Sequence, residues 1–114
     1  MCKVVHINKQ PYDIYIGRHP DLIIGKWGNP YTHHAEKDTL AKYIVSTRKE
    51  AIEKYREYIL FGEGKHLLND LHELKDKTLG CWCKPQSCHG DILVELVNKY
   101  VNEPNEFFNK FIYL

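Results

Sequence analysis

Short runs of apolar residues near the start of the chain give way, after its first third, to apolar residues at helical spacing. Lys3–Ile7 and Asp13–Ile16 are rich in β-branched and apolar residues, so each predicts a short strand. Thr78–Cys83 has the same character and predicts a short buried strand late in the chain. The stretch from Gly17 to His34 has no sustained periodicity and contains several glycines and prolines. A loop of this length in a compact domain is typical of a functional segment.

Four segments carry apolar residues three or four positions apart, which is the spacing of one helix face. The predicted helices are Asp38–Ser46, Thr47–Leu60, Lys65–Leu74 and Cys88–Val101. Thr47 is placed to cap the second of them, and Glu50 stands where a capping box needs an acidic residue. Ser87 is the expected N-cap of the last helix.

The order of these elements predicts a single α/β, Rossmann-like layered domain over residues 1–114, with a small, partly parallel sheet flanked by helices. Ligands of such sheets lie beyond the carboxyl ends of the strands. The loop after Gly17 and the turn after Cys83 both leave such ends. We therefore expect these two segments to form one site.

Length, net charge and composition limit the number of domains, the partners and the compartment that we expect. A length of 114 residues fits one domain, and the formal net charge of +1 argues against a nucleic-acid partner. No apolar run approaches the length of a membrane span, and no signal peptide is visible, so we expect a cytoplasmic protein with no membrane contact. The aromatic residues of segment 105–114 predict a tail that packs on the body of the domain, or a homodimer contact.

The late strand and the helix after it carry Cys81, Cys83, Cys88 and His89 in the pattern C-x-C-x4-C-H. Three thiolates and an imidazole are a possible zinc-ligand set. The spacing argues partly against zinc, because adjacent residues at a helix start diverge by about 100° around its axis. The cysteines could instead fill the core, since free cysteine is often buried.

A third interpretation places the same residues in a ligand pocket. A helix that begins at Cys88 offers free N–H groups and the positive end of its dipole to an anion. The same field would lower the pKa of Cys88, making it a candidate nucleophile with His89 or Asp91 as proton carrier. Cys83 would line this pocket.

The loop from Gly17 to Tyr31 supplies the other candidate ligand contacts. Gly17 lets backbone approach a ligand closely, and Arg18 offers a bidentate donor to phosphate or carboxylate. Trp27 and Tyr31 could stack on a ring, and Asn29 could bond a polar edge. Three residues lie outside this set: Arg48 could face the loop from a helix start, whereas the pair His33-His34 is expected to be solvated.

Several motifs together resemble the domain-of-unknown-function 4326 family, whose members are small proteins of phages and bacteria. The resemblance runs from about Tyr15 to about Leu96 and is carried by Y-I-G-R, G-N-P-Y, E-A-I-E-K-Y-R-E-Y and L-G-C-W-C-K-P-Q-S-C-H-G-D-I-L. The family has no settled activity, so the likeness implies kinship and supports the site without naming a reaction.

A second, looser likeness is to an uncharacterised family with a strand ending in cysteine and a C-H-R helix start. Cys88-His89-Gly90 matches the C-H and lacks the arginine, so Arg18 or Lys84 would have to supply that anion contact. This likeness implies a Rossmann-like strand, loop and helix, and favours the pocket over zinc.

These observations lead to two functional hypotheses. In the first, the chain binds a nucleotide, nucleoside or ADP-ribose-like metabolite without a cofactor, and it is either a binding protein or a small enzyme of glycosidase or transferase type. In the second, zinc held by Cys81, Cys83, Cys88 and His89 braces an interaction module. The sequence alone leaves open whether the protein is an enzyme.

Overall fold

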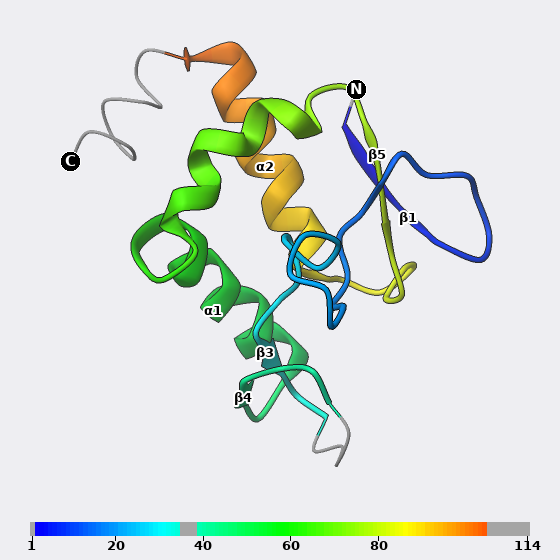
Figure 1. Cartoon of the computed structure of the whole chain (residues 1–114), viewed down its shortest axis with the longest axis vertical. Coiled ribbons are helices and arrows are strands. Elements are labelled where there is room, and N and C mark those ends of the chain that lie inside the picture. The colour runs from blue at the N-terminus through cyan, green and yellow to red at the C-terminus, as the bar shows by residue number, and fades with distance from the viewer. Residues whose placement is uncertain (1, 35–38, 105–114) are drawn as a thin grey trace.

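A computed structural model describes residues 2–34 and 39–104 and shows a three-stranded parallel sheet (Figure 1). Its strands are β1 (Lys3–His6), β2 (Ile14–Tyr15) and β5 (Thr78–Cys81), in the order β1-β5-β2. A second, two-stranded sheet pairs β3 (Tyr31–Thr32) with β4 (Tyr43–Ile44), also in parallel. The predicted α/β domain is confirmed, and all the described strand pairs are parallel rather than only some of them.

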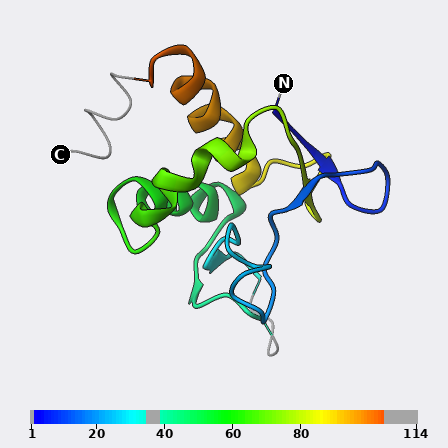
Figure 2. The same cartoon turned by 45° about the horizontal axis from the view of Figure 1, so that its top comes forward.

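Three helices lie together on one side of the larger sheet (Figures 1 and 2). They are α1 (Arg48–Phe61), the 3₁₀ helix η1 (Lys65–Leu74) and α2 (His89–Asn102). Thr47 is the N-cap of α1 as predicted, since its hydroxyl accepts the Glu50 N–H at 3.0 Å, but the Glu50 carboxylate accepts the Ser46 N–H at 3.3 Å rather than that of Thr47, so only half of the expected capping box is present. Among the described residues, no helix is long and apolar enough to cross a bilayer.

The core lies between these helices and the sheet. Tyr55 and Ile59 of α1 are fully buried there, as are Leu93 and Leu96 of α2. The 3₁₀ helix adds a row of four leucines, Leu67, Leu68, Leu71 and Leu74, each 2% exposed or less. Burial of a leucine side chain contributes about 1.5–3 kcal/mol, so this row is a large share of what holds η1 in place.

The helix predicted over 38–46 is wrong for the part that the structure describes. Residues 43–44 form β4 instead, and the N–H groups of Lys42 and Tyr43 donate to the Pro30 carbonyl at 2.8 and 3.0 Å. The Tyr43 ring stacks on that of Tyr31 with centroids 4.9 Å apart. Pairing with a distant segment therefore outweighs the local helical spacing, as often happens for short segments rich in aromatic and β-branched residues.

Two further boundaries differ from expectation. The late strand ends at Cys81 rather than Cys83, and the N-cap of α2 is Cys88 rather than Ser87. The predicted packing of segment 105–114 lies outside the described residues.

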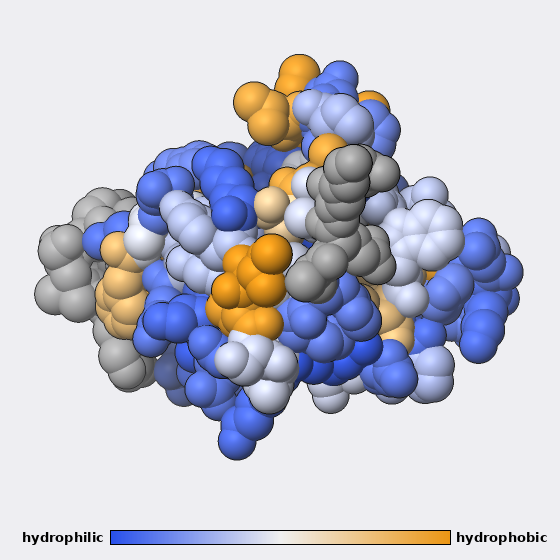
Figure 3. Space-filling model, turned by 90° about the horizontal axis from the view of Figure 1, so that it is seen from below, coloured by the Kyte–Doolittle hydropathy of each residue, from blue (hydrophilic) through white to orange (hydrophobic). Residues whose placement is uncertain are grey.

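Exposed hydrophobic side chains are dispersed over the surface. Leu22 and Ile23 are 87% and 85% exposed, and Leu40 and Ile44 more than half. On the face that Figure 3 shows, the hydrophobic side chains of the described residues form small separate groups among hydrophilic ones. This surface pattern differs from the continuous apolar patch that marks many protein interfaces.

Candidate functional site

A cavity of about 480 Å³ opens at the carboxyl ends of β2 and β5. The loop after β2 lines one wall, the first turns of α1 line another, and the turn from Cys81 to His89 lines a third. Both segments singled out in the sequence therefore border one cavity. Most of the sequence-predicted site residues lie in its lining: Gly17, Arg18, Asn29, Tyr31, Cys81, Cys83, Cys88 and His89. Trp27 and Asp91 do not.

Arg18 joins the two ends of the long loop. Its Nη1 donates to the backbone carbonyl of Asn29 at 2.9 Å and to that of Tyr31 at 3.4 Å. A guanidinium group has five N–H donors, so these two bonds leave most of the donors for other partners. Arg18 is half-buried in the cavity lining, where those donors can meet an anion.

The Asn29 side chain fastens the loop to α1 rather than standing free. Its Nδ2 donates to the Ala51 carbonyl at 3.0 Å, and its Oδ1 accepts the Tyr31 N–H at 2.9 Å. The residue is only 6% exposed. Both ends of the amide are used within the protein, so its contribution to the cavity is to hold the wall in place.

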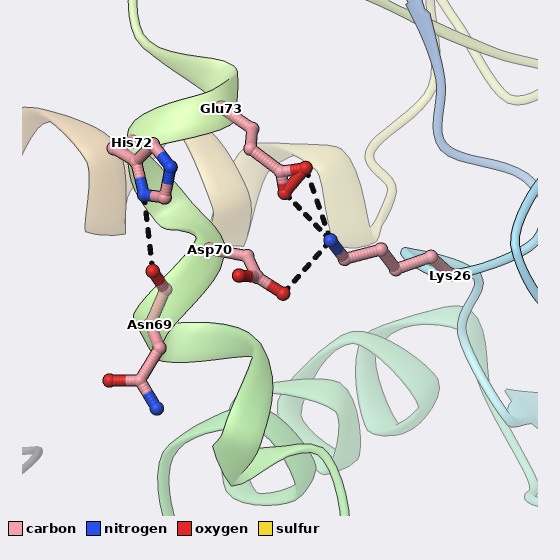
Figure 4. A network of polar contacts seen from close by, with 5 residues as sticks. All are labelled: Lys26, Asn69, Asp70, His72 and Glu73. Carbon is pink, nitrogen blue, oxygen red and sulfur yellow. Dashed lines mark hydrogen bonds and ion pairs between the residues drawn. The ribbon is translucent and has the colours of Figure 1, made fainter.

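Trp27 lies in the hydrophobic core and is 3% exposed, which corrects the expectation that it stacks on a ligand. Its backbone carbonyl accepts the hydroxyl of the buried Tyr55 at 3.0 Å. The neighbouring Lys26 reaches η1, where its Nζ lies 2.9 Å from Asp70 and 2.6 Å from Glu73 (Figure 4). The indole and this ion-pair network together anchor the loop to the helices.

Tyr15 and Trp82 form a wall that the sequence analysis missed. The Tyr15 hydroxyl accepts the Trp82 indole N–H at 3.0 Å and donates to the Arg18 carbonyl at 3.1 Å. The phenol lies over Gly17, where an added Cβ would be 2.3 Å from the hydroxyl oxygen. Gly17 therefore makes room for the Tyr15 ring, a close approach that no larger residue permits.

The three cysteines of the turn, Cys81, Cys83 and Cys88, form a thiol cluster at the base of the cavity. The sulfur atoms of Cys81 and Cys88 are 3.4 Å apart and buried, whereas Cys83 is half-buried. Hydrogen bonds from the Cys81 and Cys88 thiols, with a further one from Arg48, lower the pKa of the Cys83 thiol far below its usual range. Burial opposes this shift without cancelling it.

The pKa of Cys88 moves in the opposite direction to the one expected from its place at a helix start. Hydrogen bonds with the Cys81 and Cys83 thiols, together with burial, raise the pKa of Cys88 far above its usual range. The bond from the Gly90 backbone N–H lowers it only slightly in comparison. The thiolate of the cluster is therefore carried by Cys83, and Cys88 keeps its proton.

His89 packs the start of α2 against the end of β2. Its Nε2 is 2.6 Å from the Ile16 carbonyl oxygen, so this nitrogen carries the proton that the bond requires. The ring packs against that of Tyr55 with centroids 4.9 Å apart. Burial lowers the pKa of His89 despite the opposing effect of the Ile16 carbonyl. The imidazole is therefore neutral at physiological pH, with Nε2 as a donor.

Asp91 caps α2 from outside the cavity lining. Its carboxylate accepts the Cys88 N–H at 3.2 Å and lies 2.6 Å from the Lys84 ammonium. These contacts are those of a capping box reinforced by an ion pair. The carboxylate that the sequence offered as a base thus stabilises the turn that carries the thiol cluster.

The zinc set expected as the alternative does not form a metal-binding group. All four of its side chains are described, and within residues 2–34 and 39–104 no three histidine, cysteine or acidic side chains are arranged to hold a metal ion. His89 is also turned toward the Ile16 carbonyl. The sulfur atoms of Cys81 and Cys88 instead share a hydrogen bond at 3.4 Å.

The charged side chains around the cavity are positive. Arg18 and Arg48 line it, and none of the described lining residues is an aspartate or glutamate. Burial, followed by the charges of His34, Arg48 and Arg18, lowers the pKa of His33. The fixed positive charges at this part of the surface are therefore those of Arg18 and Arg48.

His33 and His34 line the cavity, and His34 is exposed to solvent as the sequence analysis expected, whereas His33 is half-buried. They directly follow β3, and a position just after a strand is the signal that could have identified them. Arg48 does face the loop, as its place at the start of α1 allowed. Its Nη1 donates to the Ser87 carbonyl at 3.3 Å, which links α1 to the cysteine turn.

Comparison with known proteins finds relatives but no activity. An uncharacterized protein of Acanthamoeba polyphaga mimivirus, R718, is 34% identical over 102 residues, which cover 80% of this chain and 73% of that protein. An uncharacterized 12.4 kDa protein from the nrdA-td intergenic region of Enterobacteria phage T4 is 32% identical over 101 residues, covering 87% and 80%. No solved structure matches the chain. Residues 3–99 match a domain of unknown function, DUF4326, and the chain therefore belongs to that family.

Proposed function

We propose that the cavity binds a small anionic, nucleotide-like molecule: a nucleotide, a charged nucleoside derivative or an ADP-ribose-like metabolite. The observation that carries this proposal is the charge of the lining. Arg18 and Arg48 border the cavity from two different segments, with no carboxylate among the described residues around them. Guanidinium groups recognise phosphate through paired N–H donors, so two of them across one cavity favour a phosphate-bearing ligand.

The size and the aromatic residues of the cavity also support a ligand with a ring. A volume of about 480 Å³ is typical of sites for small molecules. Tyr31 is held by stacking on Tyr43, and Trp82 is held by its bond to Tyr15 while remaining 57% exposed. Aromatic faces fixed in this way can stack on a base at little entropic cost.

The contacts made by the side chains proposed for catalysis favour a binding function over an enzymatic one. His89 is buried with Nε2 bonded to Ile16, and Asp91 is engaged by Lys84 and by the α2 cap. Neither has the free, solvent-facing geometry of a general base. The proposed function is therefore capture of the ligand, in a reducing compartment such as the cytoplasm, where four free cysteines are stable.

A thermal-shift screen with AMP, ADP, ADP-ribose and adenosine tests the proposal. A ligand at about one hundred times its dissociation constant stabilises the folded state by about 2.7 kcal/mol, which raises the melting temperature by several degrees. We expect this shift with the phosphate-bearing compounds and a weaker one with adenosine. Because the arginines supply the anion contacts, Arg48→Ala should remove most of the shift.

Arg56→Ala is the matched control for that substitution. Arg56 also lies on α1, but it pairs with Glu95 of α2 and does not line the cavity. This variant should melt at a lower temperature and keep the full ligand-induced shift. The proposal is contradicted if the wild-type chain shows no shift with any of the phosphate-bearing compounds, or if Arg48→Ala responds as strongly as the wild type.

A further inference from the structure

The thiol cluster contains two kinds of cysteine. Cys81 and Cys88 are 1% and 3% exposed, with sulfur atoms 3.4 Å apart. Cys83 is half-buried and borders the cavity, so reagents in the cavity can reach its sulfur. Cys2, the remaining cysteine, is buried in the core at the start of the chain and stands outside the cluster.

The surroundings of Cys83 stabilise negative charge on its sulfur. The thiols of Cys81 and Cys88 and the Arg48 guanidinium line the same cavity as Cys83, and polar contacts with these three groups lower the pKa of the Cys83 thiol. Arg48 is itself held by the Ser87 carbonyl, so it does not depend on the sulfur for its position. A thiolate next to arginine and accessible from a cavity is the environment of reactive cysteines, whereas buried neutral thiols are inert until a partner sulfur is oxidised.

We infer that the thiol cluster is a peroxide-reactive site, in which the Cys83 sulfur attacks a hydroperoxide and Cys88 then closes a disulfide with it. This activity is independent of the proposed nucleotide-like ligand. It requires only a hydroperoxide as oxidant, and a dithiol reductant restores the starting state.

Oxidation of the thiol cluster takes two steps. The Cys83 thiolate attacks the terminal oxygen of the hydroperoxide, an S–O bond forms, the O–O bond breaks, and an alkoxide or hydroxide leaves and takes a proton from water. Sulfur loses two electrons and the peroxide gains them, giving a sulfenic acid at Cys83. The Cys88 sulfur then attacks the sulfenic sulfur, the S–S bond forms, and hydroxide leaves with the Cys88 proton as water.

The backbone favours Cys88 over Cys81 as the resolving thiol. Disulfide formation must bring two sulfurs to about 2.05 Å, so at least one residue has to move. Cys81 ends the central strand of the sheet and is paired with His6 of β1. Cys83 lies in the turn and Cys88 is an N-cap, and neither belongs to a strand or a helix interior. The turn residues can therefore approach each other at lower cost.

Peptide mapping of the full-length, reduced protein after exposure to hydrogen peroxide tests this inference. We expect a Cys83–Cys88 disulfide, reversed by dithiothreitol, with Cys2 and Cys81 still free. In Cys88→Ser the reaction should stop at the sulfenic acid, so that dimedone labels Cys83. Iodoacetamide should alkylate Cys83 at nearly the same rate at pH 6 and pH 8, whereas the rate for an ordinary thiol falls about a hundredfold over that range because such a thiol is almost fully protonated at pH 6.

Cys2→Ala is the matched control and should leave disulfide formation unchanged, since Cys2 lies outside the cluster. A Cys83 alkylation rate that falls between pH 8 and pH 6 as steeply as that of an ordinary thiol would overturn the inference, as would a Cys81–Cys88 disulfide that leaves Cys83 reduced. Both readouts use the wild-type protein and so remain decisive even if a cysteine variant does not fold.

Discussion

Hydrogen bonds to the backbone decide which polar side chains around the cavity are free to act. Asn29 and His89 both border the cavity, yet the Asn29 amide bonds Ala51 and Tyr31 and the His89 ring bonds Ile16. Arg18 makes similar bonds but retains donors, because guanidinium has five of them. The number of donors that a side chain carries therefore separates the residues that hold the wall from those that can also bind a ligand.

Gly17→Ala tests the packing of one such wall. The added methyl group would meet the Tyr15 phenol, so the ring must shift, which disturbs its bond to Trp82. Overpacking of this kind costs about 1–3 kcal/mol of unfolding free energy. We expect lower stability in urea unfolding and a changed Trp fluorescence spectrum. Tyr15→Phe, which loses the hydroxyl and keeps the ring, should change the spectrum with a smaller loss of stability. Equal stability of Gly17→Ala and the wild type would refute this account.

His89 gives the fold a pH dependence with a defined sign. Its pKa is lowered in the folded state, so below about pH 6.5 the unfolded chain binds more protons than the folded one. The free energy of unfolding should therefore fall between pH 7.5 and 5.5, with a slope from this one group of at most about 1.4 kcal/mol per pH unit. His89→Gln keeps an N–H donor for the Ile16 carbonyl and does not titrate, so its stability should depend less on pH. An unchanged slope in this variant would exclude His89 as the source.

Single-residue roles were the hardest to predict from the sequence. Asn29, Trp27 and Asp91 were all chosen by residue type, but the Asn29 amide bonds Ala51, the Trp27 indole is buried in the core and the Asp91 carboxylate caps its own helix at Cys88. Likewise, the field at a helix start predicts a low pKa for Cys88, whereas two neighbouring thiols decide it. Such partners are fixed by tertiary structure, which local sequence does not encode.

At the scale of elements, local sequence signals predicted secondary structure correctly where they agreed with the tertiary contacts. The Thr47 N-cap of α1 and the four inward leucines of η1 are present as predicted. The helix predicted over 38–46 was wrong because Tyr43 and Ile44 pair with β3, which lies some ten residues earlier in the chain. Its short helical pattern had no cap or core contact strong enough to compete with that pairing.

The leucine row of η1 predicts how this element is held. Leu71 is fully buried, so Leu71→Ala should lower the free energy of unfolding by about 2–5 kcal/mol. Leu22→Ala removes the same atoms from a side chain that is 87% exposed, and it should change stability by no more than about 0.5 kcal/mol. Denaturant unfolding of the two variants measures the difference, and similar losses would show that η1 does not pack as described.

At the scale of the whole molecule, topology was the most informative feature. In a parallel sheet the carboxyl ends of the strands meet at one edge, and the ends of β2 and β5 do so here. This rule alone brought the Gly17 loop and the cysteine turn together in the prediction. For the third wall, built from α1, the sequence analysis identified only Arg48.

The same arrangement explains how the parts of the cavity support each other. Lys26 fastens the loop to η1, Asn29 fastens it to α1, and Arg48 fastens α1 to the cysteine turn. A cavity whose walls are tied in this way is preorganised, which lowers the entropic cost of binding. The account therefore predicts that a ligand binds without a large rearrangement of the fold.

The most direct test of this account is an NMR titration of the ¹⁵N-labelled protein with ADP-ribose. We expect saturable shifts concentrated on backbone amides around the cavity, among them those of Arg18, Tyr31, Arg48 and Cys83, with little change for η1. Shifts spread over the opposite side of the molecule, or none at concentrations up to millimolar, would contradict the proposal that this cavity is a site for nucleotide-like anions.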